Sequence, residues 1–501
     1  MVKKKDMNKE YILALDQGTS SCRAIIFNKK ADIVGIEQKE FRQIFPHAGW
    51  VEHDPEEIFS VQLEVAEKVL MNNKILPEQI NCIGITNQRE TCLLWDKNTG
   101  KPVYNAIVWQ DTRTSDFCEN LKKTSWLEYI KKTTGLMIDS YFSASKIKWI
   151  FENVSGVRKK AEEGNILFGT IDTWLLWKFS GGKSHFTDVS NASRTMLFDI
   201  SKLKWDKKLL ELFNIPQSIL PEVTETSYLF GHTSCSVFLN SEIPITAMVG
   251  DQQAALFGQA CFDPGMIKNT YGTGCFALMN TGEKIKQSEH GLLTTIAWKL
   301  NGKTNYALEG SVFIAGAAIQ WLRDGLQMIN SATETEALAE SSNKDNDLYF
   351  VPAFTGLGTP YWDMYARGAI IGITRDIRHK EIVRAALDAI AYQTRDVIDV
   401  MISDSGLQMK QINVDGGACA NNYLMQFQSD ILNVVIARPL ITESTALGAA
   451  FFAGLHTGFW TINDIKNIKK TDRIFTPTIT QQKREQLYSG WKKAVEKVRN
   501  K

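Results

Sequence analysis

The residues best suited to chemistry stand where short apolar runs end in polar turns. The first such turn is the segment DQGTSS at residues 16–21, which separates the apolar runs Tyr11–Leu15 and Arg23–Phe27. A turn rich in Gly, Thr and Ser exposes backbone N–H groups and hydroxyls that can bind phosphate oxygens. Asp16, which follows the first run, could also hold a hard cation through water. The alternative is an ordinary hairpin turn whose Asp and Thr side chains bond to their own backbone.

Two further glycine turns occur in the second half of the chain. Tyr271-Gly272-Thr273-Gly274 links the runs Met266–Tyr271 and Cys275–Met279, so the strand, glycine turn and strand of the N-terminus recur here. Two such loops could hold one polyphosphate, although each alone is more often a plain hairpin. Asp415-Gly416-Gly417 follows a short apolar run and precedes a helical pattern, which would let a ligand approach the backbone and the helix N-terminus. Helix packing against these glycines is the alternative.

Charged residues also follow two apolar runs that predict buried strands. Asp251 ends the apolar segment Pro244–Asp251 and opens an Ala-rich helical pattern, so it could be a general base or a helix cap. Arg89 and Glu90 follow the strand predicted around Ile83 and Ile85. An adjacent donor and acceptor could hold substrate hydroxyls, whereas the alternative for such a pair is a surface ion pair.

Composition limits the classes of protein that these turns could belong to. The chain has 501 residues, 44% of them hydrophobic and 23% charged, and a net charge of +1. This balance gives no broad electrostatic field, so we expect no nucleic-acid partner. No apolar run reaches the length of a membrane span, and the N-terminus has no apolar signal region, which predicts a cytoplasmic protein. The eight cysteines are scattered with no C-x-x-C spacing, as expected of reduced thiols.

Regular elements are predicted around these residues. Asp54-Pro55-Glu56-Glu57 is a typical helix start, and the apolar residues after it recur at helical spacing. The other predicted elements are strands at Cys92–Trp95, Val103–Trp109, Ile166–Phe168 and Ile412–Val414, and helices at Ile382–Met401, Asn421–Leu432 and Thr445–Gly454.

The repeated strand–glycine turn–strand unit predicts a duplicated α/β architecture. We place the boundary between residues 257 and 258. The N-terminal domain, residues 1–257, then carries the first turn and the charged strand ends. The C-terminal domain, residues 258–501, carries the second turn and the glycine pair.

Longer segments resemble a known family, the FGGY carbohydrate kinases, from Tyr11 to about Trp460. The segment YFSASKIKW at residues 141–149 matches one long family signature, and residues 368–388 match the other. Within the family, residues 49–55, 83–90, 191–198, 250–258 and 269–276 resemble the members that phosphorylate glycerol.

The resemblance implies a fold and a reaction. The fold is the two-domain, actin/Hsp70/hexokinase-like (ribonuclease H-like) α/β ATPase fold, with the active site in the interdomain cleft. The reaction is transfer of a phosphoryl group from ATP to glycerol, with Mg²⁺, giving sn-glycerol 3-phosphate and ADP. Members are commonly dimers or tetramers, so a homodimer or higher homo-oligomer is expected by analogy.

Residue by residue, the match implies three groups of contacts. Glycerol would be held by Arg89, Glu90, Trp109, Tyr141, Asp251, Gln252 and Phe276, with Asp251 as general base and the Trp109 and Phe276 rings as apolar walls. The nucleotide would contact Thr19, Ser20, Ser21, Arg23, Thr273, Gly316, Gln320, Gly417 and Asn421. The metal would lie near Asp16.

Three other functions are open on the sequence. A kinase for a larger sugar, such as xylulose or gluconate, is disfavoured by the Trp109 and Phe276 walls, because a three-carbon substrate needs a small closed pocket. A non-metabolic actin- or Hsp70-like ATPase would not need Arg89, Glu90 and Asp251 together. A catalytically inactive sensor would not need the full set of site residues.

Overall fold

The computed structural model describes residues 9–343, 346–363 and 365–499, and the chain divides into two compact units. Unit 1 is Met1–Ala260, Thr294–Tyr306 and Ser444–Ile468, and unit 2 is Cys261–Leu293, Ala307–Glu443 and Lys469–Lys501. Neither unit is one continuous stretch of chain. The boundary expected between residues 257 and 258 stays a prediction, and the chain first passes into unit 2 after Ala260.

Unit 1 is built on a mixed sheet with the order β13-β14-β5-β1-β2-β3. Its strands are β1 (Tyr11–Gln17), β2 (Ser21–Asn28), β3 (Ile33–Glu40), β5 (Ile80–Asn87), β13 (Ser227–His232) and β14 (Pro244–Gly250). β1 runs parallel to β5, and β5 runs parallel to β14. The register places Gln17 beside Asn87, and Asn87 beside Gly250. The residues that follow these strands, Asp251 among them, therefore begin at one edge of the sheet.

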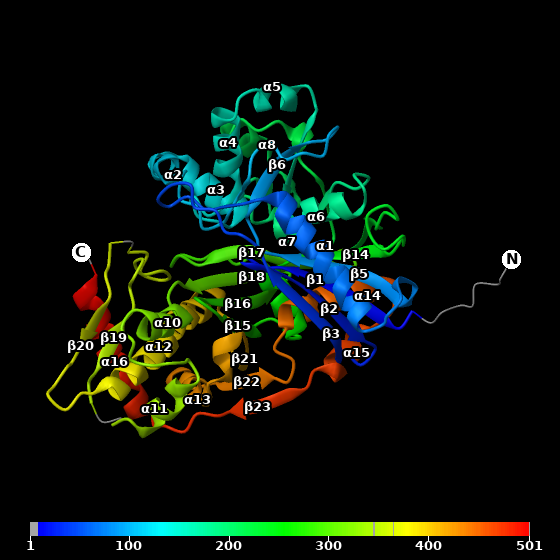
Figure 1. The fold of residues 1–501 in the computed structure, drawn as a ribbon. Helices are drawn as coiled ribbons and strands as arrows, with labels where there is room; N and C mark the ends of the chain where they lie inside the picture. Colours follow the sequence, from blue (N-terminus) through cyan, green and yellow to red (C-terminus); the bar gives the residue numbers. More distant parts are fainter. Residues whose placement is uncertain (1–8, 344–345, 364, 500–501) are drawn as a thin grey trace. The chain divides into compact units, whose positions relative to one another are not determined.

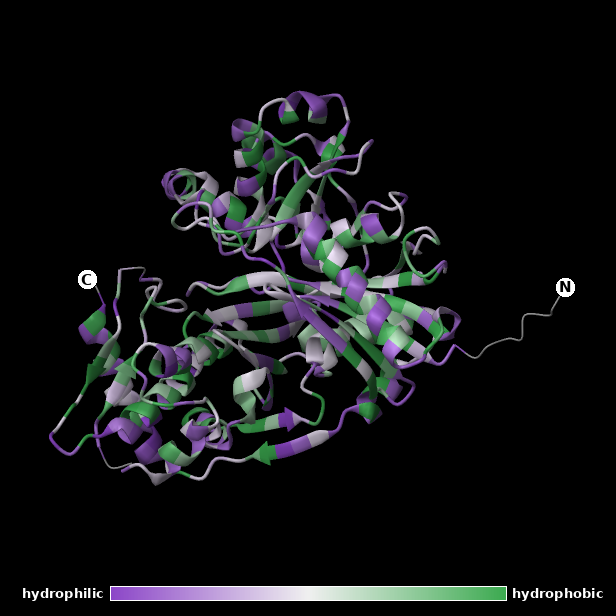
Figure 2. Ribbon diagram, in the orientation of Figure 1, coloured by the Kyte–Doolittle hydropathy of each residue, from purple (hydrophilic) through white to green (hydrophobic). Residues whose placement is uncertain are grey.

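Two helices, α1 (Pro55–Asn72) and α14 (Ser444–Thr457), cover opposite faces of this sheet (Figure 1). Neighbouring residues of a strand point to opposite faces. Ile83 and Ile85 of β5 lie in the core with the apolar side of α1, whereas a Cβ at Gly84 would collide with the Ala449 carbonyl of α14. Figure 2 shows hydrophobic and hydrophilic positions mixed along α1, as expected of a helix with one buried side.

The predicted start of α1 is confirmed. The Asp54 carboxylate caps the helix by accepting the backbone N–H of Glu56 at 2.9 Å, and Pro55 is the first helical residue. A proline suits this position because its missing N–H would have no partner within the helix.

A smaller sheet of unit 1 has the order β4-β7-β6-β8, with β4 (Glu52–His53), β6 (Cys92–Asp96), β7 (Ala106–Ile107) and β8 (Ile166–Thr170). The strand predicted at Val103–Trp109 is wrong in extent, since only β7 pairs as a strand. The Asp111 N–H bonds back to the Val108 carbonyl, which turns the chain and ends the strand.

Short helices and strand pairs complete unit 1. The helices are α2 (Ser115–Lys122), α3 (Trp126–Thr134), α4 (Ser143–Asn153), α5 (Val157–Glu162), α6 (Ile171–Phe179), α7 (Val189–Ala192), α8 (Lys207–Leu212), α9 (Asp251–Gly258) and α15 (Ile462–Ile468). The paired strands are β9 (Phe186–Asp188) with β12 (Glu222–Thr224) and β10 (Phe198–Asp199) with β11 (Lys204–Trp205). The strand β17 (Leu293–Leu300) carries the chain back from unit 2.

Unit 2 repeats the sheet pattern of unit 1. Its strands follow the order β18-β16-β15-β21-β22-β23, and are β15 (Ile267–Tyr271), β16 (Cys275–Gly282), β18 (Lys303–Val312, in unit 2 from Ala307), β21 (Gln411–Asp415), β22 (Val435–Pro439) and β23 (Thr471–Phe475). β15 is antiparallel to β16 and parallel to β21, just as β1 is antiparallel to β2 and parallel to β5. The internal repeat expected from the glycine turns is thus present in the topology.

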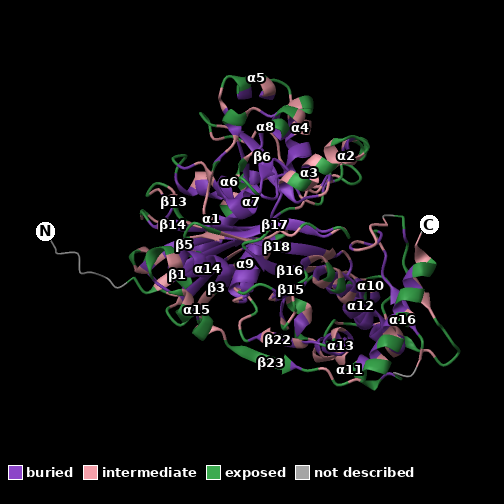
Figure 3. Ribbon diagram, turned by 180° about the vertical axis from the view of Figure 1, so that it is seen from behind, coloured by how far each residue is buried: buried purple, intermediate pink, exposed green. Residues whose placement is uncertain are grey.

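The helices of unit 2 are α10 (Gly316–Asp324), α11 (Glu334–Ser341), α12 (His379–Ser405), α13 (Asn422–Leu432) and α16 (Gln481–Val498), with a small hairpin of β19 (Tyr349–Val351) and β20 (Ala369–Ile371). The helices α12 and α13 pack on the sheet of unit 2, and the other helices of this unit pack on these two or on the hairpin. Figure 3 shows α12 and α13 largely buried. Among the described residues, no helix is both long enough and apolar enough to cross a bilayer.

Candidate active site

Charged side chains meet where β5 and β14 of unit 1 end. Arg89 Nε lies 3.2 Å from Asp251 Oδ1, and Arg89 Nη1 donates to Gln253 Oε1 at 3.1 Å. The Arg89 side chain is buried, whereas that of Asp251 is 29% exposed. Gly250 is the N-cap of α9 and Asp251 its first residue, whose Oδ1 also accepts the backbone N–H of Gln252 at 2.7 Å. Asp251 is therefore fixed by Arg89 and α9 but still reachable by a small molecule.

Glu90 is buried and is held from two sides. Arg194 Nε donates to Glu90 Oε1 at 2.6 Å, and Ser143 Oγ donates to the Glu90 carbonyl at 2.8 Å. The φ angle of Glu90 is +61°, in the left-handed region that is uncommon for residues other than glycine. Arg89 and Glu90 are 3% and 1% exposed, so the alternative of a surface ion pair is wrong. Buried charges need such partners, because losing water is costly for an ion.

An aromatic pair lies beside the first glycine turn. The Trp109 and Tyr141 rings meet edge to face, with centroids 5.5 Å apart, and the Arg194 guanidinium lies 5.8 Å from the Tyr141 centroid. Trp109 Nε1 donates to Thr19 Oγ1 at 3.0 Å. The two rings are half-buried, so they offer an apolar surface that is joined to the DQGTSS turn.

The DQGTSS turn is closed by its own backbone and keeps a carboxylate at its base. The Gly18 N–H bonds to the Ser21 carbonyl at 2.9 Å, Ser20 is exposed, and Asp16 lies 4.0 Å from Arg23 Nη1. Among the described residues, no group of three or more His, Cys, Asp and Glu could hold a metal ion alone. A single carboxylate does fit Mg²⁺ that arrives with phosphate oxygens and water, because Mg²⁺ uses few protein ligands.

Unit 2 contains a pocket of about 500 Å³. The five nucleotide-contact residues predicted in this half all line it: Thr273, Gly316, Gln320, Gly417 and Asn421. Ile319, Leu387, Ile390 and Leu424 add apolar surface. A pocket with an apolar lining and a few polar groups at its edge is typical of a small-molecule site.

Glycines shape this pocket by close approach. The Ala315 and Ala317 N–H groups bond to the Thr273 carbonyl at 2.9 and 3.1 Å, and a Cβ at Gly316 would lie 2.6 Å from the Gly272 carbonyl oxygen. The start of α10 is thereby held against the turn after β15. By contrast, a Cβ at Gly417 would meet no atom within 4 Å. The open space over Gly417 is available to a ligand.

Asn421 joins two helices at the same pocket. Its Oδ1 accepts the Leu424 N–H at 2.9 Å, which caps α13, and its Nδ2 donates to Thr335 Oγ1 of α11 at 3.0 Å. Phe276, on β16 of unit 2, is half-buried and does not line this pocket. The other six residues predicted to hold glycerol belong to unit 1.

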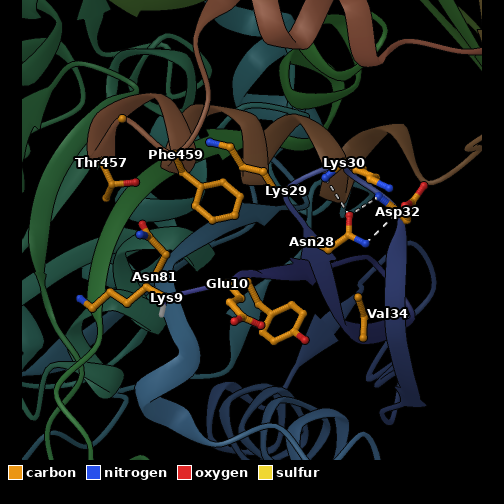
Figure 4. Close-up of a pocket in the computed structure, with 12 residues that line it drawn as sticks. Lys9, Glu10, Asn28, Lys29, Lys30, Asp32, Val34, Asn81, Thr457 and Phe459 are labelled. Carbon is orange, nitrogen blue, oxygen red and sulfur yellow. Dashed lines mark hydrogen bonds between the residues drawn. The ribbon is translucent and has the colours of Figure 1, made fainter. Parts of the chain in front are cut away.

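A second pocket, of about 710 Å³, lies in unit 1 and is lined by residues of β1, β2 and the turn after α14 (Figure 4). Asn28 Oδ1 accepts the backbone N–H groups of Lys30 and Asp32, and Lys29 Nζ lies 4.6 Å from the Phe459 ring centroid. None of the predicted site residues lines this pocket. We assign this pocket no role.

Two family models match the chain. The N-terminal domain of the FGGY family of carbohydrate kinases matches residues 11–258, and the C-terminal domain matches residues 267–456. The chain belongs to the FGGY family of carbohydrate kinases. The two-domain α/β fold expected from the resemblance is confirmed.

The chain is similar over nearly its whole length to named members of the FGGY family. Glycerol kinase 2 of Thermotoga maritima is 60% identical over 97% of this chain and 98% of its own length. Glycerol kinase of Alkaliphilus metalliredigens is 58% identical over 98% of each chain. The crystal structure of Plasmodium falciparum glycerol kinase with ADP has 39% identity and a TM-score of 0.93, covering 99% of both chains. Gluconate kinase of Lactobacillus acidophilus, at 22% identity and a TM-score of 0.86, shares the fold.

Two side chains that contact Arg89 and Glu90 are absent from the predicted site residues. Arg194 is fully buried and pairs with Glu90, and Gln253 accepts a hydrogen bond from Arg89. The segment 191–198 resembles the family, but its sequence alone assigns no role to the arginine within it. A buried carboxylate such as Glu90 was the available signal, since it requires a cation nearby.

Proposed function

We propose that this chain uses ATP to phosphorylate glycerol at a terminal hydroxyl, giving sn-glycerol 3-phosphate and ADP. The observation that carries the proposal is the meeting of Arg89 and Asp251 at the strand ends of unit 1, with Glu90 buried next to Arg89. The names of the relatives that are 57–60% identical over nearly the whole chain support the same substrate.

The polyol is held by charged groups and covered by rings. Arg89 donates to glycerol oxygens and Glu90 accepts from glycerol hydroxyls, because these side chains are already oriented by Asp251, Gln253 and Arg194. Trp109 and Tyr141 supply apolar surface for the C–H face. Gln252 of α9 and Phe276 of β16 complete the proposed set.

Asp251 is the proposed general base. The reacting hydroxyl gives its proton to the Asp251 carboxylate while its oxygen attacks the γ-phosphorus, and the bond to the ADP oxygen breaks. Arg89 orients the carboxylate through the 3.2 Å contact, and the partial exposure of Asp251 leaves room for the substrate. Phosphoryl transfer depends mainly on such positioning, since no covalent enzyme intermediate is needed.

The nucleotide contacts are proposed in each unit separately. In unit 1, Thr19, Ser20, Ser21 and Arg23 would bind phosphate oxygens, and Asp16 would hold Mg²⁺ through water. Bound Mg²⁺ would neutralise charge on the phosphates. In unit 2, the pocket lined by Thr273, Gly316, Gln320, Gly417 and Asn421 would receive the nucleoside end of ATP. A cytoplasmic location and a homo-oligomeric state belong to the same proposal.

ADP release tests the proposed function. Purified protein is incubated with Mg-ATP and glycerol, xylulose, gluconate or water alone, and ADP is measured by a coupled assay. We expect ADP release with glycerol at least about 100-fold faster than with water, the usual scale of catalysis by a positioned base. A higher kcat/KM for xylulose or gluconate would favour a larger sugar substrate, and equal rates in all samples would favour an ATPase.

A further inference from the structure

Six residues of unit 1 form a closed ring of hydrogen bonds between the DQGTSS turn and Trp109, through their side chains and two backbone groups. The six are Thr19, Gln43, His53, Gln88, Thr91 and Trp109. On one side of the ring, Gln43 Nε2 donates to the Thr19 carbonyl at 3.1 Å, and Gln43 Oε1 lies 2.8 Å from His53 Nε2. Gln88 Nε2 then lies 3.4 Å from His53 Nδ1. The two N–H groups of Gln88 are shared among this nitrogen, Gln17 Oε1 at 3.1 Å and the Gly18 carbonyl at 3.3 Å.

The other side of the ring runs to the aromatic wall. Thr91 Oγ1 donates to Gln88 Oε1 at 2.9 Å and accepts the backbone N–H of Trp109 at 3.1 Å. Trp109 Nε1 closes the ring on Thr19 Oγ1 at 3.0 Å. Arg89 and Glu90, which we propose to hold glycerol, are the residues between Gln88 and Thr91. The ring therefore joins a phosphate loop to both parts of the polyol site in unit 1.

His53 is a buried member of the ring, between Gln43 and Gln88. It is 0% exposed, and burial lowers the pKa of its imidazole to about 4. A neutral imidazole has one donor and one acceptor. Because Gln43 Nε2 is used on the Thr19 carbonyl, His53 Nε2 is the donor, and His53 Nδ1 accepts from Gln88.

The ring also sets the direction of the phosphate loop. Besides the Thr19 carbonyl, the Gly18 carbonyl accepts Gln88 Nε2 at 3.3 Å. In a trans peptide the C=O and the N–H that follows point in opposite directions. Holding these two carbonyls toward the ring therefore turns the N–H groups of Thr19 and Ser20 away from it, which is the orientation an anion requires.

We propose that His53 is a positioning residue that couples the polyol site to the first phosphate loop. Glycerol against Trp109 would fix the indole, and the ring would then favour the loop conformation that binds phosphate. The inference rests on the proposed function, because it requires glycerol and ATP as the two ligands. Neither ligand touches His53, which acts through Gln43 and Gln88.

The test measures how glycerol changes the affinity for a non-hydrolysable ATP analogue with Mg²⁺. The Kd is determined with and without saturating glycerol for the wild type, His53→Asn and His185→Asn. Asparagine at position 53 retains an acceptor in place of Nδ1 but cannot reach Gln43. His185 is the matched control, because burial also lowers its pKa to about 4 and it bonds to the Phe168 carbonyl outside the ring.

We expect glycerol to tighten analogue binding at least about fivefold in the wild type, the lower end of typical coupling between sites. His53→Asn should reduce this factor to near one, while His185→Asn should keep it. Gln43→Leu removes the same link at a half-buried position and should reproduce the loss if His53→Asn fails to fold.

Two results would overturn the inference: a wild-type factor near one, or equal factors in the wild type and both ring variants. Glycerol phosphorylation by the wild type is measured alongside. If it is absent, the proposed function itself fails, whereas phosphorylation with unchanged factors in the ring variants refutes the coupling alone.

Discussion

At the scale of single residues, the adjacent charged side chains of Arg89 and Glu90 contact different neighbours. Arg89 reaches Asp251 and Gln253, while Glu90 reaches Arg194. Arg89 Nε lies 3.9 Å from Glu90 Oε1, although each side chain also has a further partner of its own. Glu90 lies three residues beyond the end of β5 at Asn87 and has a left-handed φ. Non-glycine residues in this region cost about 1–3 kcal/mol and persist where the surroundings fix them. The buried pair with Arg194 is such a constraint.

The base assignment makes a prediction at this scale. Asp251→Asn keeps the size of the side chain and its contact with α9 but cannot accept the proton. We expect kcat to fall by at least about 100-fold, whereas the Kd for glycerol should change much less. Steady-state kinetics and glycerol titration calorimetry measure the two quantities. A variant that keeps more than about a third of the wild-type kcat would show that Asp251 is not the base.

At the scale of elements, the same three-strand pattern carries a different turn in each unit. The turn between β1 and β2 is tied to side chains, through Gln43, Gln88 and Trp109. The turn between β15 and β16 is tied instead to the backbone of α10, through its Thr273 carbonyl. The side-chain hydrogen bonds of the β1–β2 turn can change when a ligand binds against Trp109. The close backbone packing of the β15–β16 turn against α10 leaves that turn little freedom to move.

The two glycines after β21 have different surroundings. Gly416 packs against backbone, whereas Gly417 faces open space that a ligand could use. Gly416 has a φ of +84°, and a Cβ there would collide with the Tyr271 carbonyl, so Gly416→Ala should destabilise unit 2. Gly417→Ala meets no atom of the protein, so its unfolding free energy should stay within about 0.5 kcal/mol of wild type. If the nucleotide approaches this backbone, Gly417→Ala should raise the KM for ATP about fivefold, the loss of one hydrogen bond. Urea unfolding and ATP titration at saturating glycerol decide this, and an unchanged KM would place the nucleotide elsewhere.

The imidazole of His53 adds a pH dependence to the stability of unit 1. Its pKa is about 4 in the folded chain and about 6.5 when unfolded, so the unfolded chain binds the proton first as the pH falls. The stabilising contribution is therefore present above about pH 6.5 and is lost toward pH 4, by up to about 1.4 kcal/mol per pH unit. Urea unfolding at pH 7.5 and 5.5 should show a smaller stability difference between wild type and His53→Asn at pH 5.5.

Asp172 adds a second pH dependence to the stability of unit 1. Burial raises the pKa of its carboxyl to about 7, so its contribution has the opposite sign and weakens as the pH rises. It is present in both proteins and cancels in the difference. A difference that does not change with pH would show that His53 is not neutral by burial.

At the scale of the whole molecule, the reactivity of the cysteine thiols shows whether either unit opens in solution. Seven of the eight cysteines are buried and Cys235 is exposed. Burial raises the pKa of Cys92 and Cys419 to about 12, and that of Cys261 to about 11. A buried thiol with a raised pKa carries little thiolate and reacts slowly.

Titration with Ellman's reagent should therefore label one thiol quickly in the native protein and eight in guanidinium. The fast reaction should disappear in Cys235→Ser. Because Cys235 is not among the proposed site residues, its modification should leave the rate of glycerol phosphorylation unchanged. Fast labelling of several thiols would show that a unit opens in solution.

The sequence by itself determined the local elements and the family. The Asp54 cap, the glycine turns and the apolar runs depend on residues close together in the chain, so α1, the β1–β2 turn and the β15–β16 turn were predictable. The same reasoning overextended β7, because the turn at Asp111 depends on its own hydrogen bonds rather than on apolar spacing. Only the tertiary structure showed Arg194 beside Glu90 and the ring through His53. These contacts join residues far apart in the chain, and the burial that gives them their strength exists only once the chain is packed.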